Sequence, residues 1–130
     1  MKLKRTKINK HLVKVSIGCE LDQHTGTICG ELEIDLEYAS KFNSEFMALI
    51  QEYDQQIILC FENVPYIDSE GLWAVFDIYR KLADQGKTLV ISNPNENVKR
   101  VFKIIKLDSK IKIFNTEEQA IKNFEGLKNF

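Results

Sequence analysis

The sequence of 130 residues has few of the residues from which metal sites and hydrolase triads are built. Its two histidines, His11 and His24, stand apart from each other and from any cysteine. Neither histidine has the spacing of a metal ligand or suggests a Ser/His/Asp triad, so no metal and no other cofactor is expected. The three cysteines, Cys19, Cys29 and Cys60, are odd in number and far apart, which predicts reduced core thiols in a cytoplasmic protein.

The sequence also lacks a long apolar run and a large net charge. No run is long enough to span a membrane, and the apolar residues near the start alternate with polar ones instead of forming the block of a signal peptide. The formal net charge of −1 gives no reason to expect nucleic acid as a partner. With 44% hydrophobic residues, the chain should fold as one globular domain with a single core.

Positive charge is concentrated at the start of the chain. The first 14 residues contain no Asp or Glu but six basic residues, Lys2, Lys4, Arg5, Lys7, Lys10 and Lys14. This segment could touch an anionic surface or be a solvated tail, and we prefer the tail because no aromatic residues interleave with the charges. We therefore predict a basic tail over residues 1–10 and a folded domain over residues 11–130.

Strands and helices are predicted to alternate along this domain. Apolar alternation and short apolar runs predict strands at 11–18, 27–36, 56–61, 87–92 and 111–114. Three- and four-residue apolar spacing predicts helices at 38–53 and 69–85, a third carrying Val98, Val101, Phe102 and Ile105, and a last one starting near residue 116. The first two strands should form a hairpin, and later strands should pair in parallel. The fold class is therefore α/β, a mixed sheet of four or five strands packed with about four helices.

Residues 56–77 are predicted to form the centre of this fold. The continuous apolar run at 57–61 is typical of a central strand that is covered on both faces. The sequence Asp68-Ser69-Glu70-Gly71 follows, and Asp and Ser are favoured residues at the start of a helix. Ser69 should therefore lie at or beside the positive end of a helix, with its hydroxyl near the surface.

This stretch resembles the signature of the STAS domain, which occurs in sulfate transporters and in bacterial anti-sigma factor antagonists. The family pattern after a buried strand is Asp-Ser-Ser-Gly-Leu-Gly, and the Ser after the Asp is phosphorylated by a partner kinase. Four positions match and two depart from the pattern: Asp68, Ser69, Gly71 and Leu72 match, while Glu70 and Trp73 replace a Ser and a small residue.

Other segments extend the resemblance over almost the whole chain, from about Val13 to Phe124. Gly30-Glu31-Leu32 resembles the family's Gly-Glu-Leu-Asp, with Glu33 in the Asp position. Asn93-Pro94 and the apolar residues after it resemble the entry to the family's third helix. A likeness of this length is far more specific than a lone tetrapeptide.

The resemblance implies a bacterial partner-switching regulator and not an enzyme. It implies that the protein binds an anti-sigma factor or a related serine protein kinase while Ser69 is free and is released when Ser69 is phosphorylated. A serine phosphatase would reset the switch, and no membrane insertion is implied. A phosphoserine carries about −1.5 to −2 charges near neutral pH, which a partner shaped for a neutral hydroxyl would reject. The competing structural interpretation is that Ser69 only caps its helix.

Partner binding is expected to involve Ser69 and the residues around it, Asp68, Glu70, Gly71, Trp73 and Glu33. Glu70 suits the first turn of a helix, but it could also weaken recognition by a kinase or mark a relative that does not switch. Trp73 falls outside the expected core stripe of its helix, where it would be either an interface anchor or covered by a loop. Glu33, like Asp35, could orient the partner or be an ordinary solvated acid. The expected core stripe is Leu72, Val75, Phe76, Tyr79, Leu82 and Ala83.

Two other functions compete with the switch. The first is a STAS subunit of a larger transport or stress-signalling complex, in which Ser69 is never phosphorylated. The second is a small enzyme or nucleotide binder, which ranks last because the sequence has no Gly-rich phosphate loop and no nucleophile–base pair. The basic residues Lys99, Arg100, Lys103 and Lys106 are expected to form a solvated face of the third helix.

Overall fold

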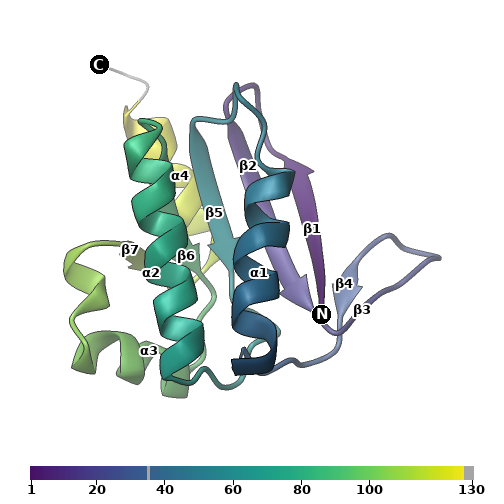
Figure 1. Ribbon diagram of the computed structural model, residues 1–130. Helices are drawn as coiled ribbons and strands as arrows, with labels where there is room; N and C mark the ends of the chain where they lie inside the picture. Colours follow the sequence, from purple (N-terminus) through teal and green to yellow (C-terminus); the bar gives the residue numbers. More distant parts are fainter. Residues whose placement is uncertain (35, 128–130) are drawn as a thin grey trace.

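The computed structural model describes residues 1–34 and 36–127, so the candidate Asp35 lies outside the described residues (Figure 1). A five-stranded mixed sheet with the order β1-β2-β5-β6-β7 forms the centre of the molecule. Its strands are β1 (Lys2–Lys7), β2 (Leu12–Gly18), β5 (Gln56–Cys60), β6 (Thr88–Ser92) and β7 (Lys112–Phe114). The helices are α1 (Leu36–Leu49), α2 (Ser69–Asp84), α3 (Glu96–Ile104) and α4 (Glu117–Leu127), with the 3-10 turn η1 (Leu107–Ser109). The predicted α/β class, the mixed sheet and the number of helices are confirmed.

The sheet is covered on both faces, with α1 and α2 in front of it and α4 behind it (Figure 1). Alternate residues of the central strand β5 supply the two cores. Ile57 and Leu59 are fully buried in the larger core under α1 and α2, while Ile58 packs in the smaller core with Phe124 of α4. Burial on both faces explains why β5 is an unbroken apolar run. β5 pairs in parallel with β2 and β6, and this pairing places the carboxyl ends of these strands at one edge of the sheet.

The prediction of a basic tail over residues 1–10 is wrong, because Lys2–Lys7 form the edge strand β1. This strand pairs antiparallel with β2, from Lys2 opposite Gly18 to Lys7 opposite Val13. Charged side chains are common on edge strands, where they discourage pairing with another chain. Leu3 packs on the larger core, and Arg5 forms an ion pair with the buried Asp54.

The predicted hairpin between residues 11–18 and 27–36 is also wrong, because β2 pairs with β1 instead. Among the described residues of the second segment, only Ile28–Cys29 (β4) form a strand, which pairs with Glu20–Leu21 (β3) in a separate two-stranded sheet. Gly30 follows β4 with φ at +81°, a left-handed conformation that ends the strand. Further along, Ile34 makes one isolated parallel bridge to Ile67.

The buried faces of α2 and α3 differ from the expected stripes. The buried side chains of α2 belong to Ala74, Val75, Ile78 and Leu82. Ala83 is exposed, and Leu72, Phe76 and Tyr79 are half-buried because they lie beside the sheet-facing stripe and not within it. On α3 only Val98 and Phe102 are buried, and Ile105, just beyond its end, is 48% exposed.

The cysteines are free, but only Cys60 is a core thiol. Cys19 and Cys29 are exposed at the base of the β3–β4 hairpin, so the prediction of three core thiols is wrong for two of them. None of the helices within residues 1–34 and 36–127 is long and apolar enough to cross a membrane.

Candidate functional site

Ser69 is the first residue of α2, at the carboxyl-end edge of the sheet. The loop after β5 reaches it through Val64 and Ile67, whose side chains are buried and fix the path of the chain. Asp68 ends this loop in an extended conformation, and its Oδ1 accepts a hydrogen bond of 2.9 Å from the Gly71 N–H. The predicted position of Ser69 at the start of the second helix is confirmed.

Asp68, and not Ser69, caps the helix. The Ser69 side chain is exposed, and within the described part of the chain no group forms a hydrogen bond with its hydroxyl. The competing interpretation, in which Ser69 serves only as the cap, therefore fails. The hydroxyl lies at the positive end of the helix dipole, where an anion attached to it is stabilised by the free N–H groups of the first turn.

Gly71 holds the start of α2 close to the segment before α1. A Cβ atom at this position would lie 2.3 Å from the carbonyl oxygen of Ile34 and 2.7 Å from Cγ1 of Ile67. The Asp68 N–H also donates to the Ile34 carbonyl at 3.3 Å. Glycine is therefore required here for a close approach of two segments, and Gly71 itself is buried.

The same contact brings Glu33 into the neighbourhood of the Ser69 turn. Glu33 is exposed and directly precedes Ile34, the residue that contacts the start of α2. Glu70 is likewise exposed and adds a second acid to the first turn of the helix, where the dipole favours it. The surface around the hydroxyl is therefore acidic before any phosphate is added.

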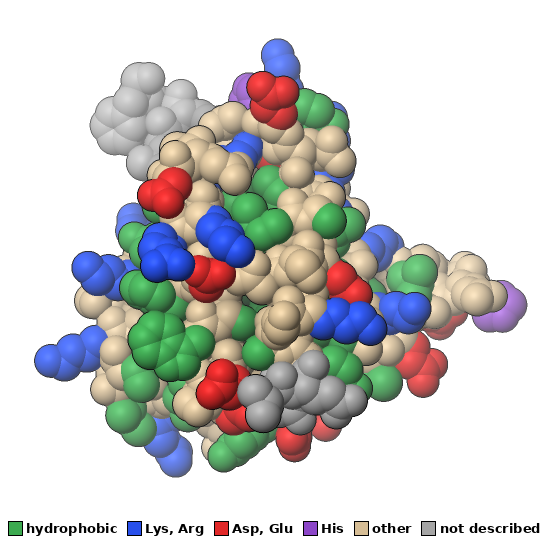
Figure 2. All heavy atoms as spheres, in the orientation of Figure 1, with side chains coloured by type: hydrophobic (Ala, Val, Ile, Leu, Met, Phe, Trp, Pro, Cys, Tyr) green, Lys and Arg blue, Asp and Glu red, His purple; other side chains and the backbone are tan. Residues whose placement is uncertain are grey.

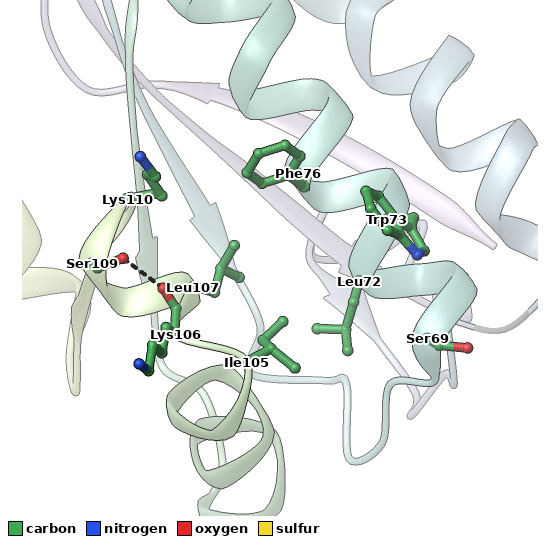
Figure 3. Close-up of a pocket in the computed structure, with 9 residues that line it drawn as sticks. All are labelled: Ser69, Leu72, Trp73, Phe76, Ile105, Lys106, Leu107, Ser109 and Lys110. Atoms are coloured by element: carbon green, nitrogen blue, oxygen red, sulfur yellow. Dashed lines mark hydrogen bonds between the residues drawn. The ribbon is translucent and has the colours of Figure 1, made fainter.

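Trp73 lies one turn after Ser69 and is 67% exposed, so no loop of the described chain covers it. Its ring packs edge-on against Phe76, with the ring centroids 6.2 Å apart. Figure 3 shows Trp73 beside a groove between α2 and the turn that joins α3 to η1. We call this the α2–η1 groove; its volume is about 480 Å³, and its apolar lining comprises Leu72, Trp73, Phe76, Ile105 and Leu107.

The opposite wall of the α2–η1 groove carries basic and polar side chains, Lys106, Ser109 and Lys110. Lys106 has left-handed backbone angles, with φ at 61° and ψ at 30°. Its carbonyl accepts a hydrogen bond of 2.7 Å from the Ser109 hydroxyl, which fixes the turn (Figure 3). Figure 2 shows hydrophobic side chains gathered over the lower part of α2 and toward α3, with Lys and Arg side chains around them.

Sequence reasoning missed this groove. Ile105 was assigned to the buried stripe of the third helix and Lys106 to its solvated face. The helix ends at Ile104, and the left-handed residue at Lys106 turns the chain so that both side chains line the groove. The available signal was the pair Ile104-Ile105, because two adjacent apolar residues cannot both lie on the narrow face that Val98 and Phe102 define.

The arrangement offers an exposed hydroxyl and a binding surface. His11 hydrogen bonds through Nδ1 with the Tyr53 carbonyl, and His24 stands in the turn between β3 and β4. Neither is positioned to take a proton from Ser69. Among the described residues, no group of three His, Cys, Asp or Glu side chains could hold a metal ion.

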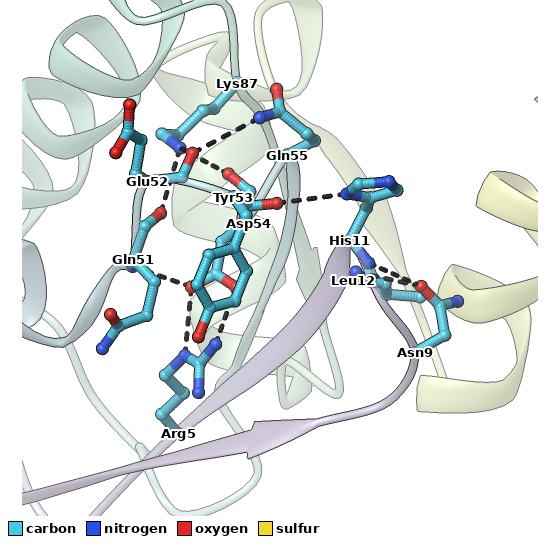
Figure 4. A network of polar contacts seen from close by, with 10 residues as sticks. All are labelled: Arg5, Asn9, His11, Leu12, Gln51, Glu52, Tyr53, Asp54, Gln55 and Lys87. Atoms are coloured by element: carbon cyan, nitrogen blue, oxygen red, sulfur yellow. Dashed lines mark hydrogen bonds and ion pairs between the residues drawn. The ribbon is translucent and has the colours of Figure 1, made fainter.

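A second polar cluster lies at the opposite end of the sheet, where β5 and β6 begin (Figure 4). Arg5 contacts the fully buried Asp54 through two hydrogen bonds, of 3.0 and 2.7 Å. Burial raises the pKa of the Asp54 carboxyl, but the hydrogen bonds from Arg5 and the Gln51 N–H outweigh it, so the pKa lies below that of a free aspartate. The Lys87 ammonium donates to the carbonyl oxygens of Gln51, Glu52 and Asp54. Every one of these groups holds the α1–β5 loop in place, so we assign the cluster to stability.

Comparison with known proteins gives a consistent result. Residues 20–120 match the family model of the STAS domain. A protein of Thermotoga neapolitana that is assigned as an anti-sigma factor antagonist is 30% identical over 95 residues, which are 72% of this chain and 84% of that protein. The anti-sigma-B factor antagonist of Bacillus subtilis is 27% identical over 94 residues, again 72% of this chain and 84% of that protein.

Solved structures show the same fold. The anti-sigma factor antagonist SpoIIAA in its unphosphorylated form superposes with a TM-score of 0.70 at 21% identity, covering 96% of this chain and 97% of that chain. The Bacillus cell fate determinant SpoIIAA in its phosphorylated form superposes with a TM-score of 0.63 at 20% identity, covering 95% of this chain and 99% of that chain.

Proposed function

Because the chain belongs to the STAS domain family, we propose that it acts as an anti-sigma factor antagonist that changes partners through the phosphorylation of Ser69. Its relatives support the general role, since two of them carry that name. The protein binds an anti-sigma factor or a related serine kinase when Ser69 is free, and a serine phosphatase restores this state. The protein contributes a substrate hydroxyl and a surface, and it catalyses no reaction itself.

One observation carries this proposal: the Ser69 side chain is exposed at the start of α2 and its hydroxyl has no hydrogen-bond partner among the described residues, while Asp68 makes the cap. A kinase can therefore reach the hydroxyl without first breaking a hydrogen bond of the fold. The phosphate formed there gains from the N–H groups of the first helical turn, so the domain can accept it without changing shape.

The charge change provides the switch. Asp68 and Glu70 flank Ser69, and a phosphate adds about −1.5 to −2 further charges between them. A partner whose surface fits a neutral hydroxyl is then repelled, and removing water from the phosphate on binding costs free energy that no contact with the partner offsets. Glu33 and Trp73 extend the contact area on either side, and Trp73 is the aromatic anchor.

The test compares four forms of the protein in titrations against one candidate anti-sigma factor. The expected order of affinity is wild type close to Ser69→Ala, then Ser69→Asp, then the phosphorylated protein, since Asp brings about one charge and phosphate nearly two. Higher salt should reduce the differences in affinity between the four forms, because salt screens charges over roughly 10 Å at 0.1 M. Tighter binding of the phosphorylated form would mean that phosphorylation recruits this partner.

A second measurement separates the switch from a non-switching subunit of a larger complex. The kinase and ATP should label wild-type protein and leave Ser69→Ala unlabelled, and intact mass of protein from its host should show a species one phosphate heavier. Labelling that persists in Ser69→Ala would refute the site. A single unmodified mass under all growth conditions would favour the non-switching subunit, with Glu70 as the residue that prevents phosphorylation.

A further inference from the structure

We propose that the α2–η1 groove receives an amphipathic helix of the partner, whose carboxylates face Lys106 and Lys110. The proposal rests on the proposed function, because the partner is the protein that binds at Ser69. It adds which kind of segment that partner must present to the groove. Three features of the groove carry the proposal: its exposed apolar lining, the elements that line it and the unpaired charges on one wall.

The lining is mostly apolar, and large apolar side chains in and beside the groove are exposed. Trp73 is 67% exposed on one side of the groove, and Ile105 is 48% exposed on the other. Ile104, at the end of α3, is 72% exposed. An apolar hollow with a polar rim is typical of a site that binds another molecule.

The elements around the groove favour a helix as the occupant. The lining side chains come from α2, Ser69 included, and from residues 105–110, the segment that contains η1, and among the described residues none comes from a strand. An extended peptide would therefore find no backbone edge with which to pair, whereas a helix brings apolar side chains at steps of three and four residues into such a groove.

The charges on the η1 wall specify acidic residues on that helix. Within the described part of the chain, neither Lys106 nor Lys110 forms an ion pair. Lys106 stands directly after α3 in the left-handed conformation, a position where glycine is the usual residue. A lysine there carries the cost of a left-handed backbone, and its exposed ammonium group is available to a partner. The matching groups on a partner are carboxylates along one flank of its apolar face.

The experiment uses two helical peptides of 18 residues that differ only in charge. Both carry Leu along one face and no Trp; one has Glu along the flank of that face, and its twin has Lys. Trp73 is the one tryptophan of the chain, so its emission reports occupation of the groove directly. We expect the Glu peptide to shift the emission to shorter wavelength and to bind at least tenfold more tightly than the Lys peptide. Equal affinities, a preference for the Lys peptide, or no binding of either at 1 mM would overturn the proposal.

Variants locate the charge preference. Lys106→Gly keeps the left-handed turn and removes the ammonium, so it should leave the melting temperature unchanged or higher while reducing the preference for the Glu peptide about threefold or more. The matched control is Lys103→Gln, which removes the same charge three residues earlier, where the side chain lines a different hollow with Lys99 and Lys112. If both variants lose the preference for the Glu peptide equally, only the net charge of the protein matters, and the preference cannot be assigned to Lys106.

The same titrations distinguish other occupants and separate this proposal from the switch. Concentration-dependent dimerisation with a shifted Trp73 emission, or tighter binding of laurate than of the Glu peptide, would overturn the proposal in favour of a second copy or a small amphiphile. The Ser69→Asp protein tests the link to the switch. If it binds the Glu peptide as tightly as wild type does, the groove binds the helix and the charge at Ser69 does not affect that binding. If neither peptide binds wild-type protein but the kinase still phosphorylates Ser69, the groove proposal is refuted and the proposed function is not.

Discussion

Arg5 of β1 and Asp54, which lies two residues before β5, form a two-point ion pair. Nη2 is 2.7 Å from Oδ1 and Nε is 3.0 Å from Oδ2, although the two residues are 49 positions apart in the chain. The Asp54 side chain is 1% exposed and the Arg5 side chain 19%. A buried carboxylate needs such a partner, because desolvation alone would drive it to its neutral form. The pair therefore ties the edge strand to the centre of the sheet.

Acid should weaken the ion pair between Arg5 and Asp54. The folded-state pKa of Asp54 is lowered, so its contribution to stability is complete above the pKa of the unfolded aspartate and is lost as the pH falls through the folded value. We expect the free energy of unfolding by urea to fall between pH 5 and pH 3 more steeply in wild type than in Arg5→Met. Identical slopes would show that the pair contributes nothing to the acid sensitivity.

At pH 7, Arg5→Met should destabilise the protein by about 3 kcal/mol. This is the lower end of the effect of removing one partner from a buried ion pair, because Arg5 keeps some access to water. Lys2→Met, which changes an exposed charge on the same strand, is the control and should change the stability by less than about 0.5 kcal/mol. Urea unfolding of both variants measures the difference.

Asp68→Ala and Ser69→Ala should differ in stability although they are neighbours. Asp68→Ala removes the cap of α2 and should cost about 1 kcal/mol. Ser69→Ala removes a hydroxyl that has no partner in the described chain and places a good helix former in the first turn, so its cost should be a few tenths of a kcal/mol at most. The reverse order in urea unfolding would mean that Ser69 is the cap in solution.

Gly71→Ala should displace the start of α2. The new Cβ would lie 2.3 Å from a backbone oxygen of Ile34, and overpacking against backbone typically costs about 1–3 kcal/mol. Amide chemical shifts of Ile34 and Ser69 should move together, while Glu70→Ala, an exposed change beside it, should move only its neighbours. Unchanged shifts at Ile34 would contradict the close approach.

Trp73→Ala should reduce partner affinity by more than about 1 kcal/mol and change the stability little, since most of its ring is already in water. Tyr53→Ala is the matched control, because Tyr53 is a similarly exposed aromatic residue, at 51%, at the opposite end of the sheet. Calorimetric titration with the partner measures the affinity. An equal loss in both variants would show that Trp73 is no anchor.

The centre of the fold was predictable because its signals are local. The apolar run of β5, the cap residue Asp68 and the apolar spacing of α2 lie within 30 residues, and together they place Ser69 correctly. β1 was missed because the acid that pairs with Arg5 is Asp54, far along the chain, and no local pattern distinguishes a charged edge strand from a tail. The α2–η1 groove was missed for a similar reason, since a single left-handed residue, Lys106, brings Ile105 beside Leu72.

The position of Lys87 has a consequence for the order in which the protein is assembled. Its ammonium completes the hydrogen bonding of carbonyls at Gln51, Glu52 and Asp54, more than 30 residues earlier in the chain. A nascent chain that ends before Lys87 therefore lacks the ammonium group that joins these three carbonyls, and the α1–β5 loop then depends on local hydrogen bonds such as the one from the Asp54 N–H to the Gln51 carbonyl. We expect the first half of the chain to stay sensitive to proteases on the ribosome until β6 has emerged, and the amides at the end of α1 and in β6 to exchange with solvent as one cooperative unit.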